Sequence, residues 1–182
     1  MLDNADGGVR LKRGVEDADR YGRVLGHLFS PTGEHLGARL IRQGLAFAIA
    51  VPPNLGFQAC LREAENEARN RGHGLWSKPD LALRSVENLG SFKGGFVRVR
   101  GRLDGVGFSR DALWLQIGGH LGVRIHKTDL VHFRRWNFHS LQGQEVVVRG
   151  WISPTRRGLR MRLKHPNDLE IGDGMDATPS SD

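Results

Sequence analysis

The residues of this sequence with the most evident chemistry are arginines that recur at every second position. Alternate side chains of a β-strand point to opposite faces, so this spacing places the arginines together on one face of a strand. The segments that show it are 96–103 and 159–164, and segment 145–152 adds an arginine and a tryptophan. The side chains that we predict to form a binding surface are Arg98, Arg100, Arg102, Arg149, Trp151, Arg160, Arg162 and Lys164.

Rows of basic side chains beside an exposed aromatic residue are typical of proteins that bind single-stranded nucleic acid. The cations contact phosphates, and the aromatic ring stacks on a base. The alternative is that these arginines form the polar exterior of a small barrel and only keep it soluble. Few acidic residues occupy the same alternating positions, and this favours single-stranded DNA or RNA as the partner.

The distribution of charge supports a polyanionic partner. The 182-residue chain has a formal net charge of +7. Residues 88–172 contain 15 basic and 6 acidic residues, a net charge of +9, whereas residues 1–87 carry +1 and residues 173–182 carry −3. A field of one sign over one segment attracts polyanions, although it also serves solubility.

The pattern of apolar residues predicts that these arginines belong to a small β-barrel at residues 92–172. Short alternating segments separated by glycine, aspartate, serine or proline predict strands, and a helix is expected at 129–141. Three strands, a helix and two strands is the order of an OB-fold barrel, with a small sandwich as the alternative. We expect residues 78–91 to be a linker and residues 173–182 to be a disordered acidic tail.

Residues 1–77 predict a separate α+β domain. Strands are expected at 9–12 and 23–29, and a helix from Leu36 that ends at Gly44. Apolar residues at 57, 60, 61, 64 and 68 have helical spacing, which predicts an amphipathic helix over 57–71. The whole chain is therefore expected to be mainly β with helices.

Three short motifs in this first domain give it a family resemblance. They are Asp19-Arg20-Tyr21-Gly22-Arg23 before a strand, Arg42-Gln43-Gly44-Leu45-Ala46 at the end of a helix, and Gly74-Leu75-Trp76-Ser77 after the long helix. Their order and spacing resemble the C-terminal half of the staphylococcal-nuclease-like (thermonuclease) domain. Segments 148–151 and 164–171 resemble an extension that follows the nuclease domain in some bacterial members of that family.

The resemblance implies an OB-type nuclease fold, here partial, that cleaves DNA and RNA phosphodiesters with Ca²⁺. It also implies a role for one residue, since Arg23 matches the second active-site arginine, which stabilises charge on the reacting phosphate. A guanidinium suits that role because it is planar, always charged and able to bind two phosphate oxygens. The alternative is that Arg23 only pairs with Asp17 or Asp19.

The family's calcium-binding aspartates, general-base glutamate and first arginine all precede the strand that matches residues 9–12. We therefore expect no metal site and no cofactor in this chain, and we expect Asp17 and Asp19 to pair with arginines. The eight histidines show no metal-ligand spacing. A segment upstream of Met1, the second domain or a partner would have to complete the first domain.

Three function hypotheses follow. The first is a nucleic-acid-binding member of the thermonuclease family without nuclease activity of its own, the second is the C-terminal part of an active Ca²⁺-dependent endonuclease, and the third is an OB-type protein-interaction module. No apolar stretch approaches the roughly 20 residues of a membrane span. The first six residues do not resemble a signal peptide. The chain as given is thus expected in the cytoplasm, or outside it if a signal lies upstream.

Overall fold

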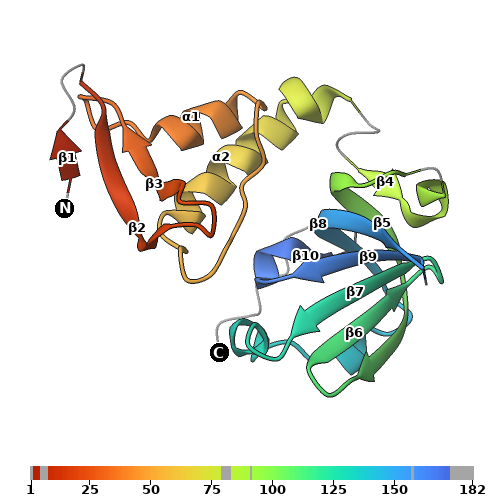
Figure 1. Ribbon diagram of the computed structural model, residues 1–182. Helices are drawn as coiled ribbons and strands as arrows, with labels where there is room; N and C mark the ends of the chain where they lie inside the picture. The colour runs from red at the N-terminus through yellow and green to blue at the C-terminus, as the bar shows by residue number, and fades with distance from the viewer. Residues whose placement is uncertain (1, 5–7, 79–82, 91, 157, 173–182) are drawn as a thin grey trace. The chain divides into compact units, whose positions relative to one another are not determined.

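The computed structural model describes residues 2–4, 8–78, 83–90, 92–156 and 158–172. The chain divides into two compact units, residues 1–78 and 79–182 (Figure 1). The tail predicted at 173–182 lies outside the described residues. None of the helices in the described ranges has the length and apolar character that a membrane crossing requires.

The first unit combines a small sheet with two packed helices. Strands β1 (Leu2–Asn4), β2 (Arg10–Ala18) and β3 (Val24–Phe29) form an antiparallel sheet in that order. Helix α1 (Leu36–Arg42) packs against α2 (Gln58–Asn70), and the 3₁₀ turn η1 (Gly74–Ser77) follows. The helical spacing of the apolar residues places Leu61 and Ala64 in a small core with Ala38 and Ile41.

Strand β2 is longer than the sequence predicts. The polar residues expected in a loop continue the strand to Ala18, which pairs with Val24 after an irregular stretch that begins at Arg13. Asn54 stabilises this stretch through two hydrogen bonds. Its side chain accepts one from the Glu16 backbone N–H (3.0 Å) and donates one to the Glu16 carbonyl (2.9 Å). The hairpin can therefore extend although its side chains are largely exposed.

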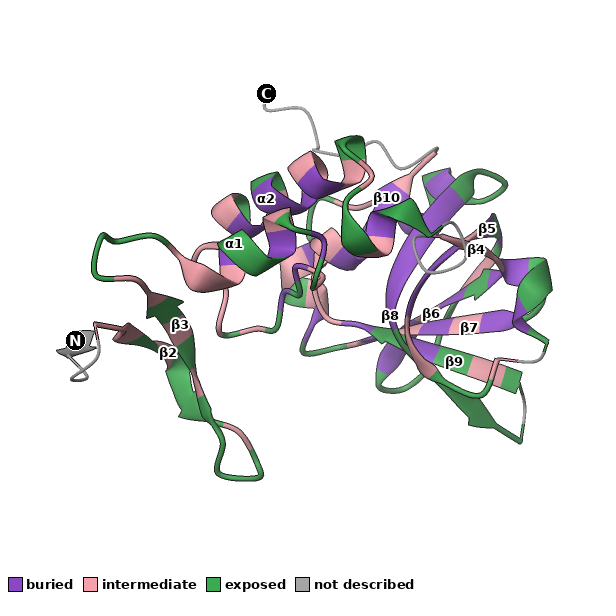
Figure 2. Cartoon of the chain, turned by 90° about the horizontal axis from the view of Figure 1, so that it is seen from above, coloured by how far each residue is buried: buried purple, intermediate pink, exposed green. Residues whose placement is uncertain are grey.

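The second unit is a closed barrel consistent with an OB fold, as predicted. Its main strands are β5 (Gly95–Phe108), β6 (Ala112–Ile117), β7 (Leu121–His126), β8 (Glu145–Thr155) and β9 (Gly158–Leu163). The strands adjoin in the order β5, β6, β7, β9, β8, and pairing of β8 with β5 closes the barrel. The inward-facing residues form one continuous apolar core. Figure 2 shows buried residues along the barrel strands, whereas β2 and β3 are mostly exposed.

Two parts of the barrel differ from the prediction. Residues 129–141 form two short 3₁₀ turns, η3 (Leu130–Phe133) and η4 (Phe138–Leu141), instead of one helix. Phe133, Phe138 and Leu141 are all buried, so the two turns direct the apolar residues of this segment into the core. Part of the predicted linker also joins the barrel, because β4 (Arg84–Ser85) pairs with β5, and η2 (Val86–Leu89) buries Val86 and Leu89 in the core.

A short segment after β9 completes the sheet. The 3₁₀ turn η5 (Pro166–Asp168) leads into β10 (Leu169–Ile171), which pairs antiparallel with β8. His165 and Asp168 cap this turn, since each side chain accepts a backbone N–H hydrogen bond from the other end of the turn. The predicted strands did not include β10, and it changes the surroundings of one predicted site residue.

Candidate nucleic-acid interface

The turn between β2 and β3 positions Arg23. Asp19 organises this turn, because its Oδ1 accepts hydrogen bonds from the backbone N–H groups of Tyr21 (2.9 Å) and Arg23 (3.0 Å). Gly22 has φ +77°, a left-handed conformation that glycine adopts without strain. The Asp19 Oδ2 then accepts from the Arg23 Nε and Nη2 at 2.7 Å each. The motif thus folds as one local hydrogen-bonded unit.

This pairing leaves the Arg23 side chain largely in solvent, with an exposed fraction of 74%. Partial burial of Asp19 opposes its ionisation, but hydrogen bonds from Arg23 and Tyr21 lower its pKa below the ordinary value of 3.8. Asp19 is therefore a carboxylate that orients the guanidinium from one edge. The other edge of Arg23 is available to a ligand.

The carboxylates near Arg23 do not fit a calcium site. Both Asp19 oxygens are used by the turn, and Asp17 lies 3.7 Å from Arg13. Calcium takes six to eight oxygen ligands. Across the described ranges no group of three or more His, Cys, Asp or Glu side chains is arranged to hold a metal ion. The described residues of this chain therefore do not match the calcium that the family resemblance implies.

The predicted basic surface of the second unit is divided by the barrel topology. Strands β5 and β9 are not neighbours, since β8 lies between them on one side and β6 and β7 on the other. The arginines of 96–103 and 159–164 therefore do not form one continuous strip. Each row has to be considered by itself.

The prediction that Arg98 and Arg149 are exposed is wrong, since both are buried. Arg98 donates from Nη2 to Glu170 Oε2 at 2.8 Å, and this ion pair is almost fully enclosed. Glu170 belongs to β10, which pairs with β8 and brings a carboxylate to this part of the barrel. Alternation along β5 alone does not reveal that a strand on the other side of β8 brings a carboxylate to the same face.

The other predicted residues lie on several strands. Arg100 on β5 is 3.5 Å from Glu145, and Arg102 is exposed further along the same strand. Trp151 on β8 has an exposed fraction of 67% and an edge contact with Phe96. Lys164, which follows β9, is half-buried.

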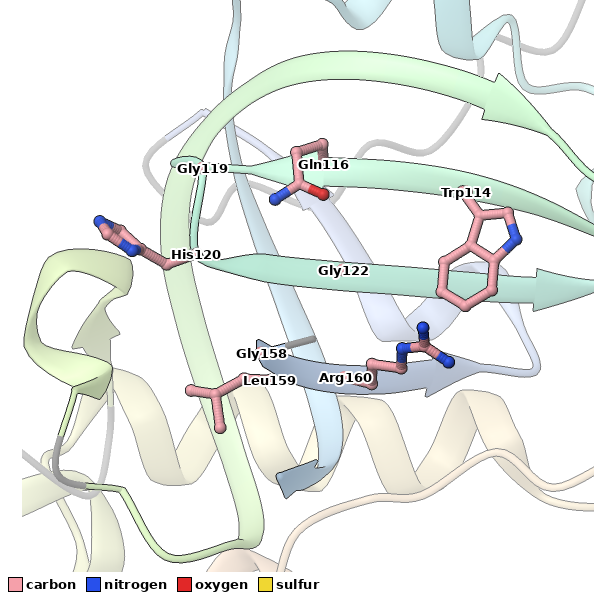
Figure 3. Close-up of a pocket in the computed structure, with 8 residues that line it drawn as sticks. All are labelled: Trp114, Gln116, Gly119, His120, Gly122, Gly158, Leu159 and Arg160. Atoms are coloured by element: carbon pink, nitrogen blue, oxygen red, sulfur yellow. The ribbon is translucent and has the colours of Figure 1, made fainter. Parts of the chain in front are cut away.

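The outer face of β6, β7 and β9 brings two predicted arginines together with two residues that the prediction missed. In register across the strands, Trp114 pairs with Arg124 and Arg124 with Arg162, while Gly122 pairs with Arg160. Arg160 lies over the Trp114 ring, 5.0 Å from its centroid (Figure 3). We call the outer side chains Trp114, Arg124, Arg160 and Arg162 the β6–β7–β9 face.

The charges on this face differ in how far they are neutralised. Arg162 pairs with Asp129 at 2.8 Å, and Arg124 pairs with Asp111. Arg160 is exposed and forms no ion pair with any acid in the described residues. The Trp114 Nε1 donates to the Ser109 hydroxyl at 3.2 Å, which fixes the plane of the ring. The face therefore presents an unneutralised cation beside an oriented aromatic ring.

The sequence contained the signal for the two missed residues. Alternation in 112–117 places Trp114 and Gln116 on the outside, and alternation in 121–126 does the same for Arg124. Both strands were predicted, but the candidate binding residues were chosen from other strands, two of which contain several arginines. Only the barrel topology shows that β6 and β7 adjoin β9.

The comparison with known proteins concerns the first unit. Residues 8–78 match the family of staphylococcal nuclease homologues. An "Uncharacterized endonuclease" of Escherichia coli is 37% identical to this chain over 62 residues, 34% of this chain and 39% of that protein. A "Thermonuclease" of Staphylococcus intermedius is 31% identical over 70 residues, 38% of this chain and 41% of that protein.

The resemblance of the first unit to the staphylococcal nuclease family is therefore confirmed. The matched region contains Arg23, its Asp19 partner and both helices of the unit. The chain spans about two fifths of the length of these relatives. The family match does not extend over the barrel, so the β6–β7–β9 face has to be interpreted from its own chemistry.

Proposed function

We propose that this chain is a nucleic-acid-binding protein of the nuclease type, whose barrel holds single-stranded DNA or RNA on the β6–β7–β9 face. The observation that carries the proposal is Arg160, an exposed cation without an acidic partner in the described residues, which lies over Trp114. Arg162 lies two residues further along β9, and Arg124 pairs with Arg162 in register. This combination offers charge to a phosphate and a ring to a base.

The architecture of the barrel supports a single strand rather than a duplex. Bases of a single strand are open to stacking, whereas those of a duplex are already stacked on each other. OB folds use the face around their second and third strands for oligonucleotides, and here those strands are β6 and β7. This is an analogy at the level of the fold, and it adds to the argument from the residues.

For the first unit we propose that Arg23 contributes a phosphate contact. Asp19 holds the guanidinium by one edge and leaves the residue exposed, as a ligand-binding arginine requires. The match of residues 8–78 to the family of staphylococcal nuclease homologues supports this role, because that region includes Arg23. We also propose that residues 8–78 correspond to the C-terminal half of a nuclease domain that the barrel follows.

Binding without cleavage is the function we assign to this chain by itself. The carboxylates nearest Arg23 are already engaged by arginines and backbone N–H groups. The second candidate is that the chain is part of an active Ca²⁺-dependent endonuclease, and the similarity to proteins named endonuclease and thermonuclease favours it.

A single experiment separates these two functions. The purified chain is incubated with a labelled single-stranded oligonucleotide and Ca²⁺, and binding and cleavage are both measured. We expect binding that Arg160→Ala weakens, with the oligonucleotide left intact. Cleavage that is lost in Arg23→Ala and kept in Arg20→Ala would establish the second candidate instead. Arg20 is the matched control because its guanidinium contacts Tyr21 rather than Asp19.

A further inference from the structure

A cavity of about 270 Å³ opens on the β6–β7–β9 face, beside Arg160 and the Trp114 ring over which it lies (Figure 3). Trp114 and Arg160 form one wall, and Gln116 and His120 lie toward the other end. Ligand pockets for drug-sized molecules occupy roughly 300–1,000 Å³. This cavity therefore matches one small planar group and not a longer segment of a ligand.

The floor of the cavity is Gly122, in the interior of a strand where glycine is unfavourable. Its backbone does not require glycine, because its φ lies outside the left-handed range. The space does not require glycine either, since an added Cβ would meet Trp114 and the Leu159 carbonyl only at 3.8 Å, an ordinary contact. A glycine that neither backbone nor packing demands is typical of a place where a ligand approaches closely.

The walls match the chemistry of a nucleobase. The Trp114 ring is oriented by its hydrogen bond to Ser109, and the Arg160 guanidinium offers a second plane for stacking. The Gln116 amide has both donors and an acceptor, and the His120 imidazole can supply either, so both suit the polar edge of a base. If the ligand of the cavity were a phosphate alone, the Trp114 ring would make no stacking contact with it.

We propose that this cavity is a subsite for one nucleobase of a bound single strand. The base enters over Gly122, stacks on Trp114 and Arg160, and directs its polar edge toward Gln116 and His120. The inference rests on the proposed function, because the strand itself is held by the charges of the β6–β7–β9 face. It adds that binding depends on the base as well as on the phosphates.

The test compares two oligonucleotides of equal length, one with bases and one abasic, on the full chain at low salt. The wild type should prefer the strand with bases by roughly tenfold, the size of one base–aromatic stack. Gly122→Val fills the floor, so this preference should fall to near one while affinity for the abasic strand stays unchanged. Gly90→Val is the matched control at the end of η2, where an added Cβ meets nothing within 4 Å and the residue does not line the cavity, and it should keep the preference.

Two further measurements keep the result interpretable. The melting temperature of Gly122→Val should equal or exceed that of the wild type, since valine favours strands. Trp114→Ala should lose the preference and Trp114→Phe should retain most of it. A preference that persists in both Gly122→Val and Trp114→Ala would overturn the subsite and leave the proposed function standing. A wild type that binds neither strand would refute the proposed function and the subsite with it.

Discussion

At the scale of single residues, Asp19 illustrates how a short motif creates a site. Its two oxygens accept hydrogen bonds from two backbone N–H groups and from one guanidinium. A carboxylate that accepts this many hydrogen bonds is favoured in its charged form, so its pKa is lowered. The same contacts hold Arg23 in one orientation while most of its side chain stays in solvent.

The first prediction concerns the titration of this carboxylate. The pKa of Asp19, followed by NMR, should lie below 3.8 in the wild type and rise in Arg23→Ala. The stability that Asp19 contributes is complete above its unfolded pKa and is lost as the pH falls through the lower folded pKa. Arg20→Ala should leave the titration unchanged, and an equal rise in both variants would contradict the role of Arg23.

Single residues also show what sequence alone can predict. Pairing of Arg23 with Asp17 or Asp19 was one alternative in the sequence, and the structure selects Asp19 because the turn places its carboxylate beside the guanidinium. Arg98 shows the limit, since its alternation with valines predicted exposure. It is buried and paired with Glu170, far along the chain, and no local pattern contains that information.

At the scale of elements, two glycines allow the segment after α1 to meet the segment after α2 in the first unit. Gly44 follows α1, Gly74 begins η1, and both have positive φ, 71° and 53°. Their backbones touch, since the Leu75 N–H donates to the Gly44 carbonyl at 2.9 Å. A Cβ on Gly44 would lie 2.1 Å from the His73 carbonyl oxygen, which no real side chain tolerates. The motif that ends α1 and the motif that follows α2 are thus the two sides of one backbone contact.

The second prediction follows from this contact. Gly44→Ala should destabilise the first unit by more than the roughly 1–2 kcal/mol that left-handed strain costs an ordinary residue, because it also meets backbone. Gly72→Ala is the control, since Gly72 has φ +62° with nothing within 4 Å, so it should show the strain alone. Equal losses of unfolding free energy in the two variants would mean that the close approach of Gly44 to the His73 backbone does not contribute to stability.

A histidine pair joins β3 to the start of α1. The Ala38 N–H donates to His35 Nδ1 at 3.1 Å, so in neutral His35 the proton lies on Nε2, which donates to His27 Nδ1 at 2.9 Å. Burial lowers the pKa of both rings below 6.5, and for His27 the nearby His35 and Lys12 lower it further. Protonation of either Nδ1 removes one of these hydrogen bonds. The pair therefore favours a neutral state.

The third prediction is that α1 loses stability in acid. Because the folded pKa values lie below the unfolded value, the contribution of the pair is complete above 6.5 and is lost as the pH falls. Amide hydrogen-exchange protection of α1, corrected for intrinsic rates, should decrease between about pH 7.5 and about pH 5.5. His35→Asn keeps a capping side chain that does not titrate and should reduce this decrease. An unchanged decrease in that variant would exclude the pair as the cause.

Elements differ in how well their patterns predict them. The strands of the barrel and the long helix α2 follow from strong periodicity. The structure confirms an OB-type barrel, and residues 8–78 match the staphylococcal nuclease family. Segment 129–141 was predicted as a helix because its apolar residues are dense, yet it forms two short turns. Strand β10 is too short to show any period, and only its pairing with β8 defines it.

At the scale of the whole molecule, charge and core are distributed unequally between the units. The barrel unit contains the large apolar core and most of the net positive charge, while the first unit has a small core and several exposed apolar side chains. Composition alone predicted the division of charge. It could not predict which of these arginines have acidic partners, as Arg98, Arg100, Arg124 and Arg162 do, or that Arg160 lies over the Trp114 ring.

The measurement that tests the central claim most directly is the salt dependence of single-strand binding. Phosphate contacts release counterions, so log affinity should fall linearly with log salt by about 0.7 per contact. Arg160→Glu should weaken binding and flatten this slope. Arg102→Glu makes the same charge change at an exposed position on β5, off the β6–β7–β9 face. It should weaken binding and flatten the slope much less than Arg160→Glu does. No binding by the wild type at low salt, or equal effects of the two reversals, would contradict the claim that this face holds the strand.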